Sequence, residues 1–200
     1  MAQKRSEMIV ETRSKLIKAA RCAFAVHGYA DSSMDDLTAE AGLTRGALYH
    51  HFGGKQGLLE AVIAQIDGEM GARLAEVMSG ASSNWEGFVE EAIAYIKMAL
   101  EPEIQRIVLL DGPSVLGDPS QWPSKNACMQ NTQHSIQRLI EEGTIKAVDA
   151  EATGRLVMGA LLGVSLWIAH SDDPQSASAK AIESFVILAS GLLIEGGEGK

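Results

Sequence analysis

The sequence has few cysteines and no motif of common enzyme chemistry. Its two cysteines, Cys22 and Cys128, lie far apart and in no spacing that a metal site uses. Their scarcity excludes a disulfide framework and fits a reducing compartment. The chain also has no glycine-rich phosphate loop, no Ser/His/Asp signature and no His/Cys metal pattern. We therefore expect a protein that is not an enzyme and that needs no cofactor and no metal.

Long apolar runs are also missing. The first fifteen residues have no apolar core that could act as a signal peptide. The longest apolar run, residues 156–169, is too short to span a bilayer and contains glycine and serine. We expect a cytoplasmic protein without a membrane partner, in which this run forms a buried helix.

Positive charge is in deficit, because 17 Lys and Arg stand against 26 Asp and Glu, for a net charge of −9. The deficit is uneven. Residues 1–60 hold eight basic and seven acidic side chains, whereas residues 61–200 hold nine and nineteen. A nearly neutral N-terminal part on an acidic body lets the first part touch a polyanion while the body is repelled from it.

Apolar residues recur at helical spacing along the whole chain, and no stretch alternates as a strand does. Gly28 ends a first helix over 7–26, and Gly42 separates a short helix before it from another over 44–52. A long helix follows from Lys55 to about residue 78. Later helices are predicted over 84–100, from Pro102 onward, over 126–142, over 150–170 and over 176–194, with a loop or broken helix end at 111–124. The sequence predicts an all-α fold.

The two short helices and the turn at 42–45 have the length of a helix-turn-helix unit. Ser33 and Thr44 are placed to cap the two helices, and Gly42 can supply the positive φ that the turn needs. Arg45 can reach a guanine edge or a phosphate. The outward residues of the second helix are Arg45, Gly46, Tyr49 and His50. Spacing alone leaves two interpretations, a DNA-reading unit or two helices that merely pack together.

The segment SSMDDLTAEAGLTRGALYHHFGGKQGLLEAV resembles the DNA-binding head of TetR-family regulators, and the likeness extends back to Thr12. The resemblance implies a head at residues 1–54 and an effector-binding and dimerisation domain at 55–200, with about nine helices in all. It implies phosphate contacts from Ser33, Tyr49 and Lys55. It implies that the DNA-binding residues are Ser33, Thr44, Arg45, Gly46, Tyr49, His50 and Lys55. Thr38 departs from the pattern, since helix-turn-helix units usually place alanine there.

The last two predicted helices are apolar over most of their circumference, so each must be buried on two sides. One interpretation is a homodimer in which they pair into a four-helix bundle, as the family resemblance also implies. The other is burial within one chain. A twofold dimer suits a palindromic operator.

Residues 55–142 would then enclose a pocket for an effector whose identity the sequence does not give. Asp111 follows the apolar run IVLL and could contact a ligand, but it could equally cap a helix or face water. The candidate ligand-binding residues are Trp85, Phe88, Ile96, Ile107, Leu110, Asp111, Trp122, Met129, His134, Trp167 and His170.

Together these features predict a homodimeric repressor that binds double-stranded operator DNA and is released by a small molecule. Two alternatives remain. One is a DNA-binding regulator without a small ligand, either an activator or one controlled by a protein. The other, from a different class, is a small-molecule enzyme, which the missing motifs disfavour.

Overall fold

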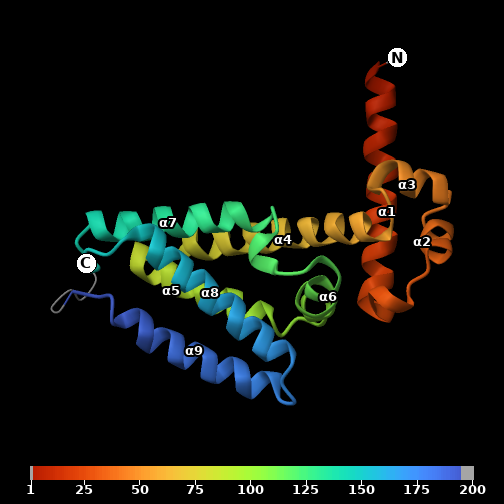
Figure 1. Ribbon diagram of the computed structural model, residues 1–200. Helices are drawn as coiled ribbons and strands as arrows, with labels where there is room; N and C mark the ends of the chain where they lie inside the picture. Colours follow the sequence, from red (N-terminus) through yellow and green to blue (C-terminus); the bar gives the residue numbers. More distant parts are fainter. Residues whose placement is uncertain (1, 195–200) are drawn as a thin grey trace. The chain divides into compact units, whose positions relative to one another are not determined.

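The computed structural model describes residues 2–194, and within them the side chains of residues 6–124 and 128–194. The described residues form nine α-helices and no strand, which confirms the predicted all-α fold (Figure 1). The helices are α1 (Ala2–Asp31), α2 (Met34–Glu40), α3 (Arg45–Phe52), α4 (Lys55–Gly80), α5 (Asn84–Met98), α6 (Gly112–Leu116), α7 (Lys125–Glu141), α8 (Ala150–Ala169) and α9 (Pro174–Ser190). A π-helical segment, η1 (Ile104–Asp111), precedes α6, and a 3-10 turn, η2 (Pro119–Gln121), follows it.

Most predicted helix ends lie within a few residues of the observed ones. The segment after residue 101 differs, because the chain stays helical through η1 and α6 to Leu116, where a loop or broken helix end was expected from residue 111. Pro113 does not break it, since Pro113 lies in the first turn of α6, where a missing N–H costs nothing. Gly117, with φ of 79°, ends the segment.

The chain divides into two compact units. The first, unit 1, is Met1–Ile66 with Pro102–Pro119, and the second, unit 2, is Asp67–Glu101 with Ser120–Lys200. Residues 102–119 therefore group with the N-terminal helices. The domains expected from the sequence, 1–54 and 55–200, place this segment with the C-terminal part instead. Helix α4 contributes its first twelve residues to unit 1 and the remainder to unit 2.

In unit 1, α1 packs against α2, α3 and η1. Leu16 and Phe24 of α1, Leu37 of α2 and Leu48 of α3 are almost completely buried. The segment 102–119 is joined to α1 by polar contacts as well. The Arg21 guanidinium donates to both Glu103 carboxylate oxygens, at 2.7 and 2.8 Å.

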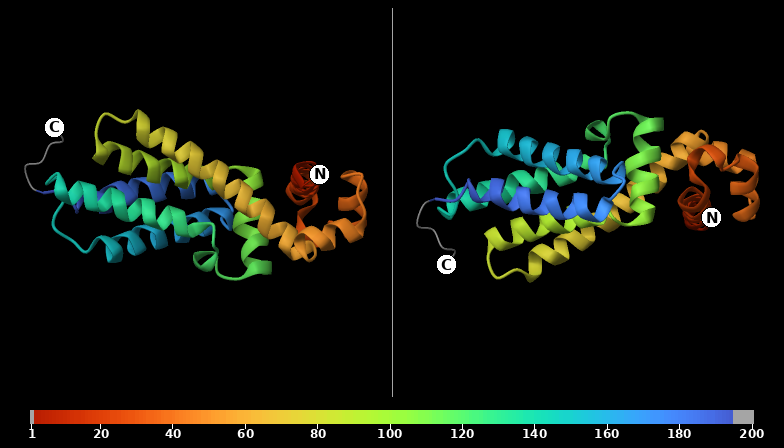
Figure 2. Two further views of the ribbon diagram at one scale, coloured as in Figure 1. Left: turned by 90° about the horizontal axis from the view of Figure 1, so that it is seen from above. Right: turned by 90° about the horizontal axis from the view of Figure 1, so that it is seen from below.

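In unit 2, α7 packs along α8, and α9 packs against α5 and α8, as both views of Figure 2 show. The core of unit 2 includes an apolar cluster of Phe88, Ile136, Leu139 and Ile145.

Helix α8 contains the apolar run at residues 156–169. Among residues 2–194 it is the one helix whose length and composition would let it cross a membrane, a weak signal that the core helix of a bundle also gives, so the expectation that it is no membrane span stands. Only 22% of its most apolar 18-residue stretch is buried. Within a single chain α8 is therefore largely exposed where a buried helix was expected, and its exposed apolar surface needs an explanation.

Candidate nucleic-acid interface and ligand cavity

In the α2–turn–α3 unit, the residue that precedes each helix caps it with a hydroxyl group. The Ser33 hydroxyl accepts from the Asp36 backbone N–H at 3.1 Å, and the Thr44 hydroxyl accepts from the Ala47 N–H at 3.2 Å. Gly42 has φ of 65°, as the turn was expected to need. The sequence therefore predicted the local geometry of this unit correctly.

Two residues for which the sequence predicted no role, Arg13 and Gly57, fix the end of α3. The Arg13 guanidinium donates to the His51 carbonyl at 2.7 Å, and its Cζ lies 4.4 Å from the centre of the Phe52 ring. A Cβ on Gly57 would lie only 2.0 Å from the Phe52 carbonyl oxygen, so the first turn of α4 comes close to α3 only because residue 57 has no side chain.

Helix α3 exposes one face and buries the other. Leu48 is fully buried, whereas Arg45, Gly46, Tyr49 and His50 are exposed, with Tyr49 at 56%. Thr44, at the N-terminal end of α3, is exposed too. The predicted DNA-contacting residues of α3 thus share one accessible surface. Arg45, Tyr49 and His50 provide hydrogen-bond donors on it.

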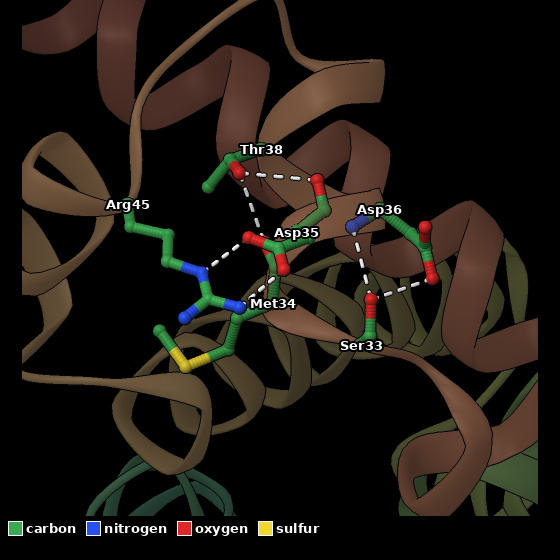
Figure 3. A network of polar contacts seen from close by, with 6 residues as sticks. All are labelled: Ser33, Met34, Asp35, Asp36, Thr38 and Arg45. Carbon is green, nitrogen blue, oxygen red and sulfur yellow. Dashed lines mark hydrogen bonds and ion pairs between the residues drawn. The ribbon is translucent and has the colours of Figure 1, made fainter.

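Arg45 is already paired in the absence of DNA. Its guanidinium forms a two-pronged ion pair with the Asp35 carboxylate of α2, as Figure 3 shows. This hydrogen-bonded pairing raises the pKa of Arg45 above its ordinary value. Because both side chains are more than half exposed, water screens the pair and DNA can compete for it. Arg45 must leave or share Asp35 in order to contact DNA.

Thr38, the departure from the usual alanine, is accommodated by hydrogen bonds. The side chain is buried, and its hydroxyl donates to the Met34 and Asp35 carbonyl oxygens of the preceding turn, at 2.9 and 3.1 Å (Figure 3). These bonds satisfy the buried hydroxyl within α2.

Two of the expected phosphate ligands are engaged inside unit 1. Ser33 donates its hydroxyl proton to the Asp36 carboxylate at 2.6 Å. The Lys55 ammonium lies 4.3 Å from the centre of the Tyr29 ring and donates to the Ala30 carbonyl at 3.3 Å. Partial burial lowers the pKa of Lys55. Either residue would have to exchange these partners for a phosphate.

Unit 2 contains a cavity of about 290 Å³, lined by residues of α4, α5, α7 and α8. Its lining is mostly apolar, and its acidic and basic side chains are Glu91, His134 and Arg138. A second cavity of about 270 Å³ shares Tyr95 and Met158 with the first. Both volumes are near the lower limit for small-molecule sites.

The candidate ligand-binding residues are dispersed. Phe88 and His134 line the first cavity, and Met129 lines the second. Trp85 packs on the apolar cluster of unit 2, and Ile96 and Trp122 are buried without lining either cavity.

Three further candidates, Ile107, Leu110 and Asp111, lie in unit 1. Asp111 accepts from the Tyr29 backbone N–H at 2.7 Å and pairs with Arg106 at 3.3 Å, so its carboxylate is used within unit 1. On α8, Trp167 is 49% exposed, and His170 ends the helix with its Nδ1 2.8 Å from the Leu166 carbonyl.

The cavity residue that sequence reasoning missed is Glu91. Burial raises the pKa of its carboxyl. The sequence did carry a signal for it. Glu91 lies three residues after Phe88 and four before Tyr95, so the helix places this acidic residue on the same face as two aromatic ones. Within the described residues no group of three or more His, Cys, Asp or Glu side chains is arranged to hold a metal ion.

The exposed apolar residues of unit 2 gather on α8 and α9. On α8, Leu156 is 74% exposed and lies on the same face as Gly159, Ala160, Gly163 and Trp167. On α9, Ile187 and Leu188 are 67% and 74% exposed. The two helices thus bury one side against their own bundle and leave an apolar side open.

Comparison with known proteins covers both parts of the chain. Residues 16–62 match the family model described as bacterial regulatory proteins, tetR family, and residues 85–192 match the tetracyclin repressor-like C-terminal domain. The regulator SrpR of Pseudomonas putida is 30% identical over 92% of this chain and 88% of its own.

Two further relatives are informative. A crystal structure of a TetR-family transcriptional regulator from Pectobacterium atrosepticum is 47% identical, with a TM-score of 0.88 over 94% of this chain and 97% of that one. The transcriptional repressor AcnR of Corynebacterium glutamicum is 34% identical over 50% of this chain and 52% of its own.

Proposed function

The chain belongs to the TetR family of bacterial transcriptional regulators, which are not enzymes, and from that premise we propose that it is a ligand-released repressor that binds a palindromic operator as a homodimer. The observation that carries the proposal is the exposed face of α3, held in place by the buried Leu48. A regulator that acts on DNA in a bacterial cell is cytoplasmic, and we propose that compartment for this chain.

The DNA contacts follow from the exposed face of α3. We assign base reading to Arg45, whose fork of donors matches a guanine edge, and phosphate contacts to Thr44, Tyr49 and Lys55. Gly46 lets the helix approach the groove closely, and His50 can donate to a phosphate or a base. Ser33 can serve a phosphate after it exchanges its Asp36 partner.

The open apolar side of α8 and α9 supports the homodimer. A monomer would leave Leu156, Ile187 and Leu188 in water, whereas a second copy would bury all three on each chain. Two α3 helices related by a twofold axis fit an operator with two inverted half-sites. Burial of this side within one chain, the alternative from the sequence, does not match the exposed positions.

The ligand response is supported by the cavity and by α4. Gly71, Leu74 and Met78 of α4 line the cavity, and the same helix begins at Lys55, close to the end of α3. A ligand that favours one position of α4 thereby favours one arrangement of the DNA-binding helices, and it shifts the population away from the operator-binding state.

The test is to select bound sequences from randomised double-stranded DNA and to measure the affinity of the full chain for the selected site. An inverted repeat should be enriched. Arg45→Ala should weaken binding to that site by about 1–3 kcal/mol and relax the base preference. Lys55→Ala should weaken binding to all sequences alike and flatten its salt dependence. Absence of any enriched sequence would overturn the proposal.

A member that activates transcription, or one controlled by a protein, would enrich the same kind of site. Adding ligand separates a ligand-controlled regulator from one controlled by a protein, since only the former loses operator affinity when its cavity is filled. The name of the relative AcnR as a repressor favours the repressor over the activator.

A further inference from the structure

The carboxylate of Glu91 lies at the cavity of unit 2 without a partner. It is the one acidic side chain in the lining, and among the described residues nothing donates a hydrogen bond to it or forms an ion pair with it. A half-buried carboxylate of this kind is costly unless something pairs with it. Burial alone accounts for the raised pKa of this carboxyl, with no stabilising charge to oppose it.

Glu91 also stands between two aromatic residues on one face of α5. Phe88 lies three residues before it and Tyr95 four residues after it, so all three line the same cavity, with the small Ala92 leaving space beside them. A carboxylate between two aromatic residues of the same lining suits an ammonium group, which gains from the charge and from the rings together.

The basic side chains of the lining do not pair with Glu91. Arg138 and His134 are exposed on α7, and Arg138 donates to the Asn84 side-chain oxygen at 3.3 Å. The charge of Arg138 is therefore screened by water, whereas Glu91 is the less accessible group. Residues 61–200 carry ten more acidic than basic side chains, nineteen against nine, and this excess favours the approach of cations.

We propose that this cavity selects an amphipathic organic cation, with an ammonium group paired to Glu91 and an apolar body against Phe88, Leu74 and Leu161. The inference rests on the proposed function in taking this ligand to be the effector. The site itself is argued only from the lining of the cavity. The volume of about 290 Å³ limits the ligand to a compact molecule with one ring or a short chain.

The test uses three matched series of phenylalkyl compounds, with two to five methylenes, that end in an amine, an alcohol or a carboxylate. Calorimetric titration of the full wild-type chain should rank the amines tightest, about tenfold or more above the carboxylates of equal length. If no amine binds more tightly than its matched carboxylate and alcohol, the proposal is wrong. This ranking needs no variant, so it stands even if a substitution disturbs folding.

A pair of variants then locates the ammonium group. Glu91→Gln keeps the shape but removes the charge, and it should weaken the best amine about tenfold while leaving the matched alcohol almost unchanged. Glu90→Gln makes the same change at the exposed neighbouring residue and should leave both affinities unchanged. Equal amine affinity in wild type and Glu91→Gln, with both folded by circular dichroism, would contradict the assignment.

The same amine is added to the operator complex to separate the two proposals. Glu91-dependent amine binding by a chain that selects no operator would sink the proposed function and leave the cavity assignment standing. Operator binding with no preference for amines would do the reverse. Release of operator by the amine in wild type, lost in Glu91→Gln, supports both.

Discussion

The two units differ in how their charged side chains are paired and in where their exposed apolar side chains gather. In unit 1, short helices are capped by their own residues, Arg45 is paired with Asp35, and Arg21 is paired with Glu103. In unit 2, Glu91 has no partner among the described residues, and α8 and α9 leave large apolar side chains in water. Unit 1 pairs the charges next to its exposed α3 face, whereas unit 2 holds an unpaired acid and an open apolar side that other molecules could satisfy.

This difference separates two kinds of task. A DNA-reading surface must be rigid before DNA arrives, because a few side chains have to meet base edges at fixed positions. A bundle that joins a second copy and responds to a ligand needs surfaces that are incomplete in the lone chain. Unpaired groups in unit 2 are therefore places to look for partners, and paired groups in unit 1 are places to look for rigidity.

The largest expected effect is at the open apolar side of unit 2. Leu188→Glu would place a charge at each of two symmetry-related positions and should weaken the dimer by about 3–6 kcal/mol, twice the value of burying one leucine. Sedimentation analysis should show a monomer at concentrations where wild type is dimeric, and operator affinity should fall with it. Val26→Glu, an equally exposed apolar position of unit 1, is the control and should remain dimeric.

The next effect tests the close approach of α4 to the end of α3 in unit 1. Gly57→Ala forces a Cβ against the Phe52 carbonyl and should destabilise the chain by about 1–3 kcal/mol, because backbone cannot move aside as a side-chain end can. Gly68→Ala, on the same helix with no atom near its Cβ, should instead stabilise by up to about 1 kcal/mol. Urea denaturation measures both. Equal effects of the two substitutions would mean that α3 and α4 do not approach as described.

A smaller effect is expected where unit 1 pairs its own charges. Asp35→Asn releases Arg45 and removes a negative charge beside α3, so operator affinity should rise about two- to fivefold at low salt. Asp36→Asn removes an equal negative charge from the neighbouring residue without releasing Arg45, and it should raise operator affinity less. Gel-shift titration measures both. A loss of affinity in Asp35→Asn would show that Asp35 orients Arg45 for DNA.

The smallest effect concerns the unpaired acid of unit 2. Because burial raises the pKa of Glu91 in the folded chain, its neutral form fits better, and stability is lost as the pH rises through that pKa. Glu91→Gln should therefore raise the Tm at pH 7.5 by about 1–3 °C. The gain should vanish below the usual glutamate pKa of about 4.3, where the carboxyl is neutral folded and unfolded.

Calorimetry at both pH values compares Glu91→Gln with Glu90→Gln, which should change nothing. A lower Tm for Glu91→Gln at pH 7.5 would show that Glu91 has a stabilising partner in the lone chain. If Glu91→Gln both raises the Tm and loses amine binding, then Glu91 is a ligand-binding group that lowers the stability of the folded chain.

The sequence by itself determined the all-α fold, the caps at Ser33 and Thr44, the turn at Gly42 and the exposed face of α3. Each of these depends on residues within a few positions of one another, where helical periodicity and capping chemistry act. The same local rules indicated helices α8 and α9 and their apolar character, although they gave no measure of how much of each helix is exposed.

Only the tertiary structure decided which side chains meet across long separations. It placed Asp111 against Tyr29, Arg45 against Asp35 and Arg13 against the end of α3, and it showed that Glu91 rather than Asp111 faces a cavity. The sequence does not show whether an acidic side chain has a partner in the folded chain. Its environment is set by helices that pack from distant parts of the chain, and no local pattern encodes that packing.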